Sequence, residues 1–245
     1  MKIRIHILVA LLFLVSFVYK GYGQRIKGYG IAGINFSQVD GDEVYGFKKV
    51  GFNGGLGATF PFNDNWSVSL EVLFSQQGAN QKAQYNDITI HDSTIVDGDT
   101  VYFDNVYNGA YKLDLNYVKV PILVQYTDRG RITAGLGFSY GQLVGIKEWE
   151  HGKLNESTTL NSGTYNKQDI DVLLDLRFRI YKSLKFNIRY SYSILKIRTR
   201  DFYDWYGQYT ETRDQYNSTL SFRFIYIFNE NPTKPVDKKN SGSGF

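Results

Sequence analysis

The sequence has no cysteine, only four prolines and only three histidines in 245 residues. Without cysteine, the chain can carry neither a disulfide framework nor a lipid-modified N-terminal cysteine. A strong charge of one sign is absent too, because 28 basic and 24 acidic residues leave a formal net charge of +4. So small a surplus gives no indication of a nucleic-acid partner.

Long hydrophobic runs are also missing, with one exception near the N-terminus. Two basic residues precede an apolar run of 12 residues, Ile7–Val18, and the small residues of Gly21–Gly23 follow it. This order is typical of a secretory signal peptide, and the run is too short to span a bilayer comfortably. We expect cleavage before Gln24, which removes residues 1–23. An uncleaved N-terminal anchor is the alternative.

Large aromatic residues and glycine are plentiful instead, with 20 Tyr, 17 Phe and 24 Gly. Apolar residues alternate with small or polar ones, which is the period of a β-strand, in eight segments. The predicted strands are Tyr29–Val39, Val50–Phe62, Trp66–Gln76, Leu115–Gly130 (ending in a turn), Arg131–Leu143, Asp169–Tyr181, Leu184–Ile194 and Thr219–Phe228. The sequence therefore predicts an all-β fold.

The predicted connections alternate between short and long. The short ones are 63–65, 127–130 and 182–183, and the long ones are 77–114, 144–168 and 195–218. Short periplasmic turns and longer extracellular loops, joining strands of about ten residues, are typical of transmembrane barrels. We expect an eight-stranded antiparallel up-and-down transmembrane β-barrel over residues 24–228, followed by a flexible periplasmic tail, 229–245.

A soluble secreted barrel or sandwich would show the same alternation, with its apolar face turned inward. The composition of the polar face favours the membrane barrel, because Gly and Ser dominate it and suit a narrow, filled interior. Aromatic residues also gather at the short-turn ends of the strands, as in a membrane-interface girdle. They are Phe60, Phe62, Trp66, Tyr126, Tyr181, Tyr226 and Phe228.

Six charged residues occupy the polar face at similar distances from the short-turn end. They are Glu71, Lys119, Asp175, Arg177, Arg189 and Arg223. We expect them to form one charged layer across the lumen, because unpaired buried charges cost several kcal/mol each. Their surplus of positive charge indicates trapped water, an anion or one wrong inward assignment. The layer is either a structural network or a proton or ion path. Pro121 should break one ladder hydrogen bond beside it.

No catalytic set, metal site or cofactor site emerges from the sequence. His91 and His151, the histidines beyond the signal peptide, both fall in loops. The acidic triplets at 40–42 and 97–99 do not continue as calcium loops. Asp97-Gly98 is better explained as a hairpin turn between two short strands. An enzyme of the outer-membrane protease or phospholipase kind stays open as a minor alternative.

The loop Arg198–Tyr216 combines aromatic, arginine and aspartate residues, a composition that protein interfaces and sugar sites favour. Its candidate partner-binding residues are Arg200, Phe202, Tyr203, Trp205, Tyr206 and Tyr209. The alternative is that these residues extend two strands above the membrane and form the upper aromatic belt.

Two stretches, Gly33–Ala79 and Leu115–Tyr126, resemble the PorT-like outer-membrane β-barrel family of Bacteroidota. The matching positions are Gly33, Asn35 and Ser37, then Leu70, Glu71, Phe74, Ser75 and Gly78, then Leu115, Tyr117, Lys119 and Pro121. The family often has an acid where Lys119 stands, so a pairing of Lys119 with Glu71 would be particular to this chain. The resemblance implies an outer-membrane location and, through the family's namesake, a link to type IX secretion.

The expected function is therefore that of a non-enzymatic outer-membrane barrel without a cofactor. It would serve as an accessory or structural subunit of an outer-membrane complex, such as a secretion or assembly machine. The expected partners are outer-membrane lipid and other outer-membrane proteins, with lipopolysaccharide as a further candidate and no nucleic acid. A small pore or transport protein, and a surface adhesin or ligand-binding barrel, are the alternatives.

Overall fold

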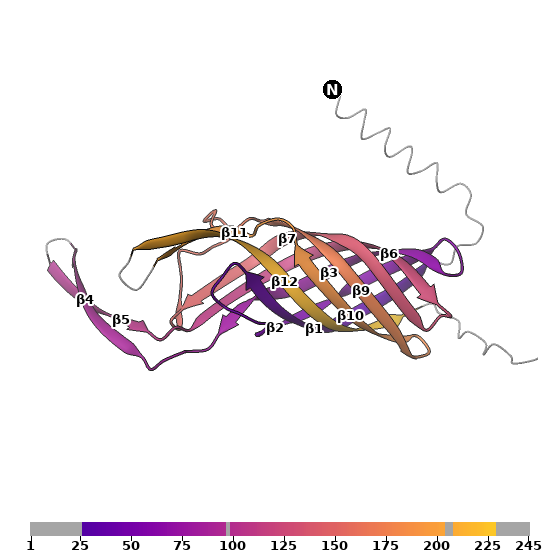
Figure 1. Cartoon of the computed structure of the whole chain (residues 1–245), viewed down its shortest axis with the longest axis horizontal. Helices are drawn as coiled ribbons and strands as arrows, with labels where there is room; N and C mark the ends of the chain where they lie inside the picture. The colour runs from indigo at the N-terminus through magenta and orange to yellow at the C-terminus, as the bar shows by residue number, and fades with distance from the viewer. Residues whose placement is uncertain (1–25, 97–98, 204–207, 229–245) are drawn as a thin grey trace, which may run out of the picture.

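The computed structural model describes residues 26–96, 99–203 and 208–228, and the regular structure within them is β-strand (Figure 1). The strands are β1 Lys27–Asp40, β2 Lys49–Pro61, β3 Trp66–Gln81, β4 Ile88–Val96, β5 Asp99–Tyr107, β6 Tyr111–Asp128, β7 Ile132–Glu150, β8 Lys153–Leu154, β9 Gln168–Tyr181, β10 Leu184–Ser193, β11 Arg198–Tyr203 and β12 Tyr209–Ile227. The predicted signal peptide and tail lie outside the described residues. No helix in the described part of the chain is long and apolar enough to cross a membrane.

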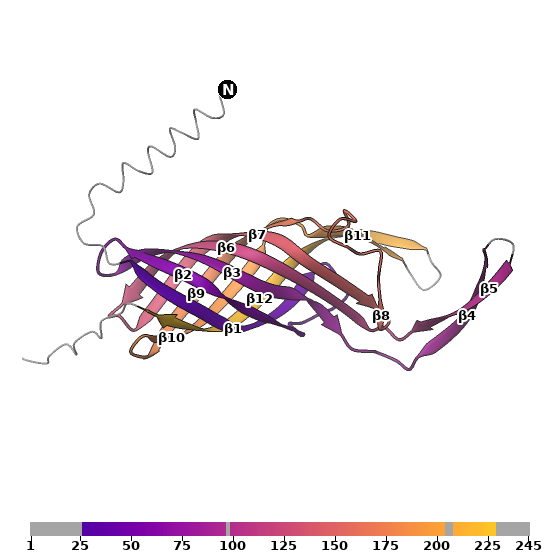
Figure 2. The ribbon, with the colours of Figure 1, turned by 180° about the vertical axis from the view of Figure 1, so that it is seen from behind.

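Eight of these strands form a closed antiparallel ring, seen from opposite sides in Figures 1 and 2. The order is β1-β2-β3-β6-β7-β9-β10-β12, and β12 pairs with β1 to close it. Consecutive ring strands are neighbours, which confirms the predicted up-and-down barrel. Closure also leaves no unpaired sheet edge to face lipid. The three short turns predicted at 63–65, 127–130 and 182–183 lie together at one end.

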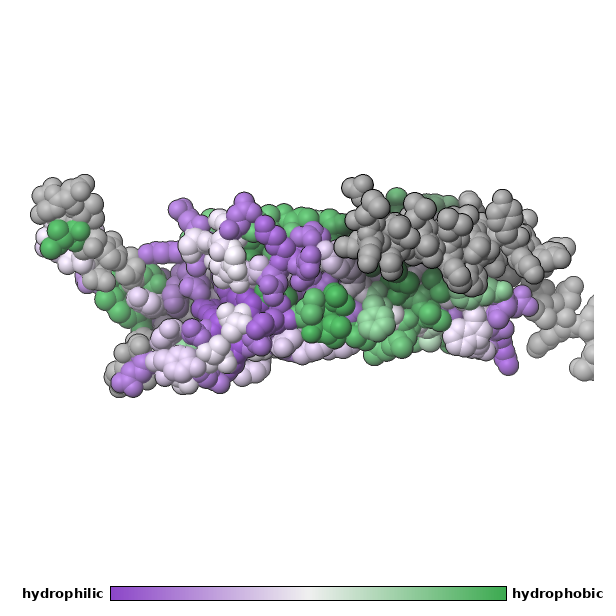
Figure 3. Space-filling view, turned by 90° about the horizontal axis from the view of Figure 1, so that it is seen from above, coloured by the Kyte–Doolittle hydropathy of each residue, from purple (hydrophilic) through white to green (hydrophobic). Residues whose placement is uncertain are grey.

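The apolar face of the ring strands points outward and the polar face points into the lumen. On β6, Val118 and Ile122 are 38% and 54% exposed, whereas the intervening Lys119 is 4% exposed. The same pattern on the other ring strands produces the hydrophobic band of Figure 3, which lies between more hydrophilic ends. An apolar belt of this kind suits lipid rather than water, so the soluble alternative is wrong.

The predicted aromatic residues lie at the short-turn end of this belt. Trp66 and Tyr126 are cross-strand partners, and their rings meet edge to face with centroids 5.2 Å apart. Tyr226 and Phe228 make a similar contact at 6.0 Å. Because amphipathic rings favour the level of the lipid headgroups, this girdle marks the periplasmic boundary of the membrane.

Above the belt, the apolar and polar faces of β6 change places. On β6, Val118 faces outward, but Tyr117, Leu115 and Leu113 face inward and are fully buried. The outward positions there are polar, and Gln76 of β3 pairs across the ladder with Asn116 of β6. The barrel therefore continues beyond the membrane with an apolar interior, as a water-soluble barrel would. We call this part the outer extension.

The outer extension makes several strands longer than predicted. β3 continues to Gln81, β6 begins at Tyr111, β7 continues to Glu150 and β12 begins at Tyr209. The predicted ends were wrong because they were placed where the outward apolar residues stop. The ladder continues past that point, and on β6 the inward residues there become the apolar ones, whereas Gln215 and Asn217 of β12 keep polar side chains inside.

β4 and β5 form a separate two-stranded hairpin that projects beyond the end of the outer extension (Figures 1 and 2). Val96 pairs with Asp99, so a two-residue connection joins the strands, as predicted for Asp97-Gly98. Those two residues themselves lie outside the described part of the chain.

Candidate functional site

Five of the six expected lumen charges form one network at mid-height in the barrel. Arg177 donates to Glu71 and to Asp175, both at 2.7 Å. Arg189 also reaches both carboxylates, each at 2.8 Å, and Arg223 lies 3.5 Å from Glu71 and 3.2 Å from Asp175. None of these side chains is more than 4% exposed. We call this network the central layer.

Neutral side chains satisfy further positions of the central layer. The Tyr29 hydroxyl donates to Oε1 of Glu71 at 3.1 Å. Asn187 donates to Oδ2 of Asp175 at 3.0 Å and accepts from Nε of Arg223 at 2.7 Å. Additional hydrogen bonds of this kind are what allow buried ion pairs to offset their desolvation.

Lys119 does not join the central layer, so its expected pairing with Glu71 and Asp175 is wrong. Its Nζ lies 3.1 Å from Oδ2 of Asp169 and 2.7 Å from Oδ2 of Asp171. Trp66 and Tyr126 pair directly, so Lys119, seven residues above Tyr126, lies two residues higher than Glu71 on β3. Two residues raise it by about 7 Å along the strand. We call Lys119, Asp169 and Asp171 the upper layer.

Pro121 lies opposite Glu71, at the level of the central layer, and interrupts the β3–β6 ladder. The pairing passes from Ile122, opposite Leu70, directly to Lys119, opposite Leu73. Proline has no N–H to donate, so this local gap is expected. It falls beside Glu71, whose carboxylate is held by side chains across the lumen.

The two layers together carry equal numbers of opposite charges. The carboxylates are Glu71, Asp169, Asp171 and Asp175, and the cations are Lys119, Arg177, Arg189 and Arg223. The surplus of positive charge expected from the sequence is therefore wrong. It arose because Asp169 and Asp171 were left out of the count, and no trapped anion is needed at this level.

A third polar cluster lies inside the outer extension. Arg198 donates to Glu148 at 2.9 Å, and the Tyr111 and Tyr165 hydroxyls donate to the same carboxylate at 2.8 and 3.2 Å. Around it packs an apolar cluster of buried side chains. Its members are Val39, Val44, Ala79, Leu113, Leu115, Tyr117, Leu143, Tyr165 and Ile197. Paired charges and apolar packing thus fill the barrel at three successive heights.

The candidate partner-binding residues are divided between buried and exposed positions. Arg200 pairs with Glu150 at 2.8 Å, and Phe202 is only 9% exposed. Tyr203 and Tyr209 are about 60% exposed, and their rings meet edge to face at 6.2 Å. Trp205 and Tyr206 lie outside the described residues. Pairing of β11 with β12 shows that this segment extends the sheet above the membrane, as the alternative interpretation held.

A pocket of about 420 Å³ opens among these residues at the extracellular end. Its lining includes Asp42, Tyr111, His151, Arg200 and Phe202. Oδ1 of Asp42 accepts from the backbone N–H of Val44 at 2.8 Å, whereas the buried Oδ2 has no hydrogen-bond partner. Burial raises the pKa of Asp42 to about 7, although the Val44 hydrogen bond and the Arg198 charge oppose the shift.

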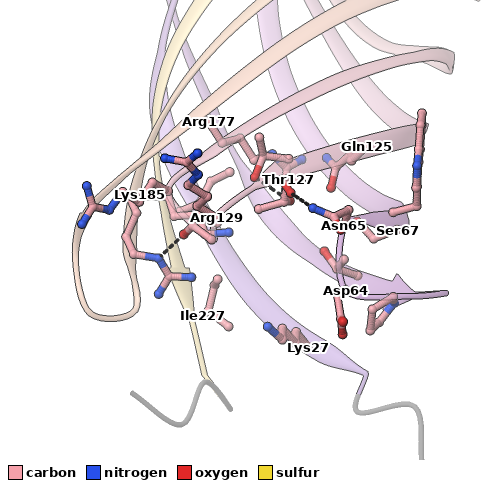
Figure 4. A pocket seen from close by; sticks show the side chains of 18 of the residues that line it. Lys27, Asp64, Asn65, Ser67, Gln125, Thr127, Arg129, Arg177, Lys185 and Ile227 are labelled. Atoms are coloured by element: carbon pink, nitrogen blue, oxygen red, sulfur yellow. Dashed lines mark hydrogen bonds between the residues drawn. The ribbon is translucent and has the colours of Figure 1, made fainter. Parts of the chain in front are cut away.

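A larger cavity of about 860 Å³ opens at the periplasmic end, below the central layer (Figure 4). We call it the vestibule. Its charged lining residues are Lys27, Asp64, Arg129, Arg131, Arg177, Arg179 and Lys185. Asn65 donates to the carbonyl oxygen of Thr127 at 2.9 Å and joins two of the turns that form the rim. The vestibule is therefore strongly basic.

The charged layer expected from the sequence did not include Asp169 and Asp171, and the basic vestibule was not expected. The parity of β9 would have identified the two aspartates, because they share the inward face with Asp175 and Arg177. The same parity places Arg131, Arg179 and Lys185 on the inward face near the short turns. Among the described residues, no group of three or more His, Cys, Asp or Glu could hold a metal ion.

A closed eight-stranded ring with an apolar outer belt and a polar, filled lumen defines a transmembrane β-barrel of the outer-membrane type. The sequence comparison places the chain within that class. Residues 27–198 match the family model described as outer membrane protein beta-barrel domain, and the chain belongs to this family.

Several solved outer-membrane proteins are similar to this chain at low sequence identity. Ail of Yersinia pestis is 15% identical, with 82% of this chain and 99% of that chain covered and a TM-score of 0.43. Neisserial surface protein A is 12% identical, with 82% and 97% covered and a TM-score of 0.46. OprG of Pseudomonas aeruginosa is 15% identical, with 83% and 94% covered and a TM-score of 0.35. No curated protein matches the chain significantly.

Proposed function

We propose that this chain is a non-enzymatic, non-conducting outer-membrane barrel that acts as an accessory or structural subunit and binds a protein partner outside the membrane. The filled lumen is the observation that carries the proposal. The central layer, the upper layer and the apolar interior of the outer extension occupy the barrel in succession. A barrel filled in this way can anchor the protein in the membrane, and its exposed outer parts can then contact a protein partner.

The β4–β5 hairpin is the surface that best suits a partner. Ile95 and Tyr102 are 74% and 79% exposed, and Ile88 and Ile90 are also exposed. Among the strands that the structure describes, β4 and β5 pair only with each other, and an isolated two-stranded ribbon is marginally stable in water. Exposed apolar side chains next to open strand edges favour a protein that adds a strand or covers one face.

Two measurements test the proposal. Purified barrel in a planar lipid bilayer should give no ion conductance, because paired charges and buried apolar side chains occupy the lumen. A photo-reactive amino acid at Tyr102 should then form a cross-link to one protein in intact outer membranes. The same amino acid at Leu154, which is 49% exposed on β8, is the control and should not. Steady conductance, or equal cross-linking at both positions, would reject the proposal.

A variant with residues 88–107 replaced by a short Gly-Ser linker separates anchoring from binding. The ring does not include β4 or β5, so this variant should still fold into the membrane. In a mild-detergent pull-down analysed by mass spectrometry, this variant should no longer retain the protein that was identified by cross-linking at Tyr102. The resemblance to the PorT-like family makes secretion and assembly complexes the first partners to look for. A surface adhesin would instead bind a target outside the cell, and intact outer membranes alone would yield no adduct.

A further inference from the structure

The pocket of about 420 Å³ at the extracellular end contains a buried carboxylate with one unsatisfied oxygen. Asp42 lines this pocket and is only 6% exposed. Its Oδ1 accepts from the backbone N–H of Val44 at 2.8 Å, whereas its Oδ2 has no hydrogen-bond partner among the described residues. Protonation does not satisfy Oδ2, because a carboxyl O–H there would still need an acceptor. Buried polar atoms are almost always hydrogen-bonded, so this oxygen points to a donor that a ligand would bring.

The two arginines whose charges act on Asp42 are already paired with other acids. Arg198 pairs with Glu148 at 2.9 Å, and Arg200 pairs with Glu150 at 2.8 Å. The positive charge of each arginine is therefore largely offset before it reaches Asp42. A buried carboxylate in such surroundings is best stabilised by a further cation.

The charged lining of the pocket is acidic as a whole. It consists of four acids and one arginine, namely Asp42, Glu43, Glu150, Asp201 and Arg200. His151 also lines the pocket, but its Nδ1 accepts from the backbone N–H groups of Asn108 and Gly109 at 3.3 and 3.2 Å. A ring nitrogen that accepts hydrogen bonds carries no proton, so this histidine is neutral. The pocket therefore attracts a cation and repels an anion.

Aromatic rings in the lining suit an organic cation. The guanidinium of Arg200 already lies over two of these rings, 5.8 Å from the centroid of Tyr111 and 5.5 Å from that of Phe202. Tyr85 and Tyr203 also line the pocket and are 40% and 62% exposed, so they offer further ring surface. The faces of such rings attract ammonium and guanidinium groups. Carboxylates and rings together match a ligand that has both positive charge and carbon atoms.

We propose that this pocket binds a small organic cation with ammonium groups, which pairs with Asp42 and packs against Tyr85 and Tyr203. The volume of the pocket lies within the range of small-molecule sites. A metal ion matches less well, because the described part of the chain has no group of three or more His, Cys, Asp or Glu that could hold one. The pocket lies at the base of the β4–β5 hairpin, where Tyr85 precedes β4 and Gly109 follows β5 (Figure 1). Its ligand is distinct from the protein partner proposed for the hairpin.

Titration with cadaverine (1,5-diaminopentane) tests the site, since alkyl amines stay protonated near neutral pH. Purified barrel in a neutral detergent at pH 8 and low salt should bind cadaverine saturably in calorimetry, and the neutral analogue 1,5-pentanediol should not bind. Asp42→Asn, which keeps the acceptor for Val44, should weaken binding at least tenfold. Glu156→Gln, at an exposed acid between β8 and β9, makes a matched charge change and should bind as the wild type does. Absence of saturable binding, or less than a tenfold difference between the two variants, would overturn the proposal.

A ¹³C titration of the Asp42 carboxyl group in the wild-type protein replaces the variant if heat-modifiable migration in a gel shows that Asp42→Asn does not fold. A bound cation favours the carboxylate, so cadaverine at ten times its dissociation constant should lower the midpoint by about one pH unit. Asp40, Arg198 and Arg200 act on Asp42 with and without ligand, so the difference reports the ligand alone. An unchanged midpoint would overturn the proposal.

The choice between a small molecule and a basic protein segment needs one further titration. Binding of an oligolysine peptide without any binding of cadaverine would overturn the small-molecule assignment. These measurements use the purified barrel without a protein partner, so their outcome does not depend on what the β4–β5 hairpin binds.

Discussion

Glu71 and Arg189 are 118 residues apart in the chain, yet two hydrogen bonds of 2.8 and 3.0 Å join their side chains. Glu71 lies on β3 and Arg189 on β10, which are on opposite sides of the ring. The pair can therefore form only when the ring is closed. Bidentate arginine–carboxylate contacts are among the strongest hydrogen bonds in proteins.

Glu71→Gln should destabilise the barrel by about 3–5 kcal/mol, because removing one partner leaves buried charge without compensation. Three arginines would then face Asp175 alone. Urea unfolding of the barrel in lipid bilayers measures the change. Glu211→Gln, which removes the exposed ion pair with Arg213, is the control and should leave the unfolding midpoint almost unchanged. Similar midpoints for both variants would contradict the central layer.

Lys119→Met should also destabilise the barrel, because Asp169 and Asp171 would lose the cation between them. The expected loss is again about 3–5 kcal/mol in unfolding free energy. Adding Asp171→Asn should recover a large part of the lost unfolding free energy, because Asp169 is then the one carboxylate left in the upper layer. The same unfolding assay measures both variants. A double variant no more stable than Lys119→Met would show that the two residues are not coupled.

Leu136→Arg tests the orientation of the strands. Leu136 is 57% exposed and lies midway along the apolar belt of β7, so we expect a cost of about 2–4 kcal/mol for arginine at this depth. Leu154→Arg, at a similarly exposed leucine of β8 above the belt, is the matched control. Its unfolding free energy in bilayers should change little. A larger loss of unfolding free energy for Leu154→Arg than for Leu136→Arg would show that the membrane does not surround the belt that contains Leu136.

Asp42 should give the outer extension a dependence on pH near neutrality. Burial raises its folded pKa to about 7, from an ordinary value of 3.8, so the folded turn favours the protonated form. The stabilisation is complete below about pH 4 and is lost as the pH rises through about 7. A ¹³C titration of the carboxyl group should show a midpoint near 7.

Two variants separate Asp42 from its neighbours. In the wild-type protein, the urea concentration at the unfolding midpoint should fall between about pH 4 and about pH 7. Asp42→Asn should remove this fall. Glu43→Gln, at the exposed adjacent residue, should keep it. A carboxyl midpoint near 4 in the wild-type protein would mean that the side chain is solvated rather than buried.

The membrane part of the fold could be predicted because a single rule governs it. From Val118 to Tyr126, each outward residue is apolar and each inward residue fills a narrow lumen, so alternation alone identifies the face. The central layer followed for the same reason. Lys119 was misassigned because counting residues from a turn gives only an approximate height, and two residues were enough to move it to other partners.

The outer extension was harder to predict because on its strand β6 the apolar side chains face inward and the polar ones face outward. The adjacent apolar residues Tyr117 and Val118 mark the change, since one faces inward and the other outward. Such a pair breaks the alternation and looks like the end of a strand. The network of Glu148 and Arg198 was missed as a result, because both residues fell in segments interpreted as loops.

The exchange of faces at Tyr117 and Val118 divides β6 into two parts, one suited to lipid and the other to water. The lower part is fixed in length by bilayer thickness, whereas the upper part is limited only by its own packing. Engineers could therefore transplant, shorten or redesign the upper part as they would an ordinary cytosolic scaffold, and the lower part would still hold the result at the cell surface.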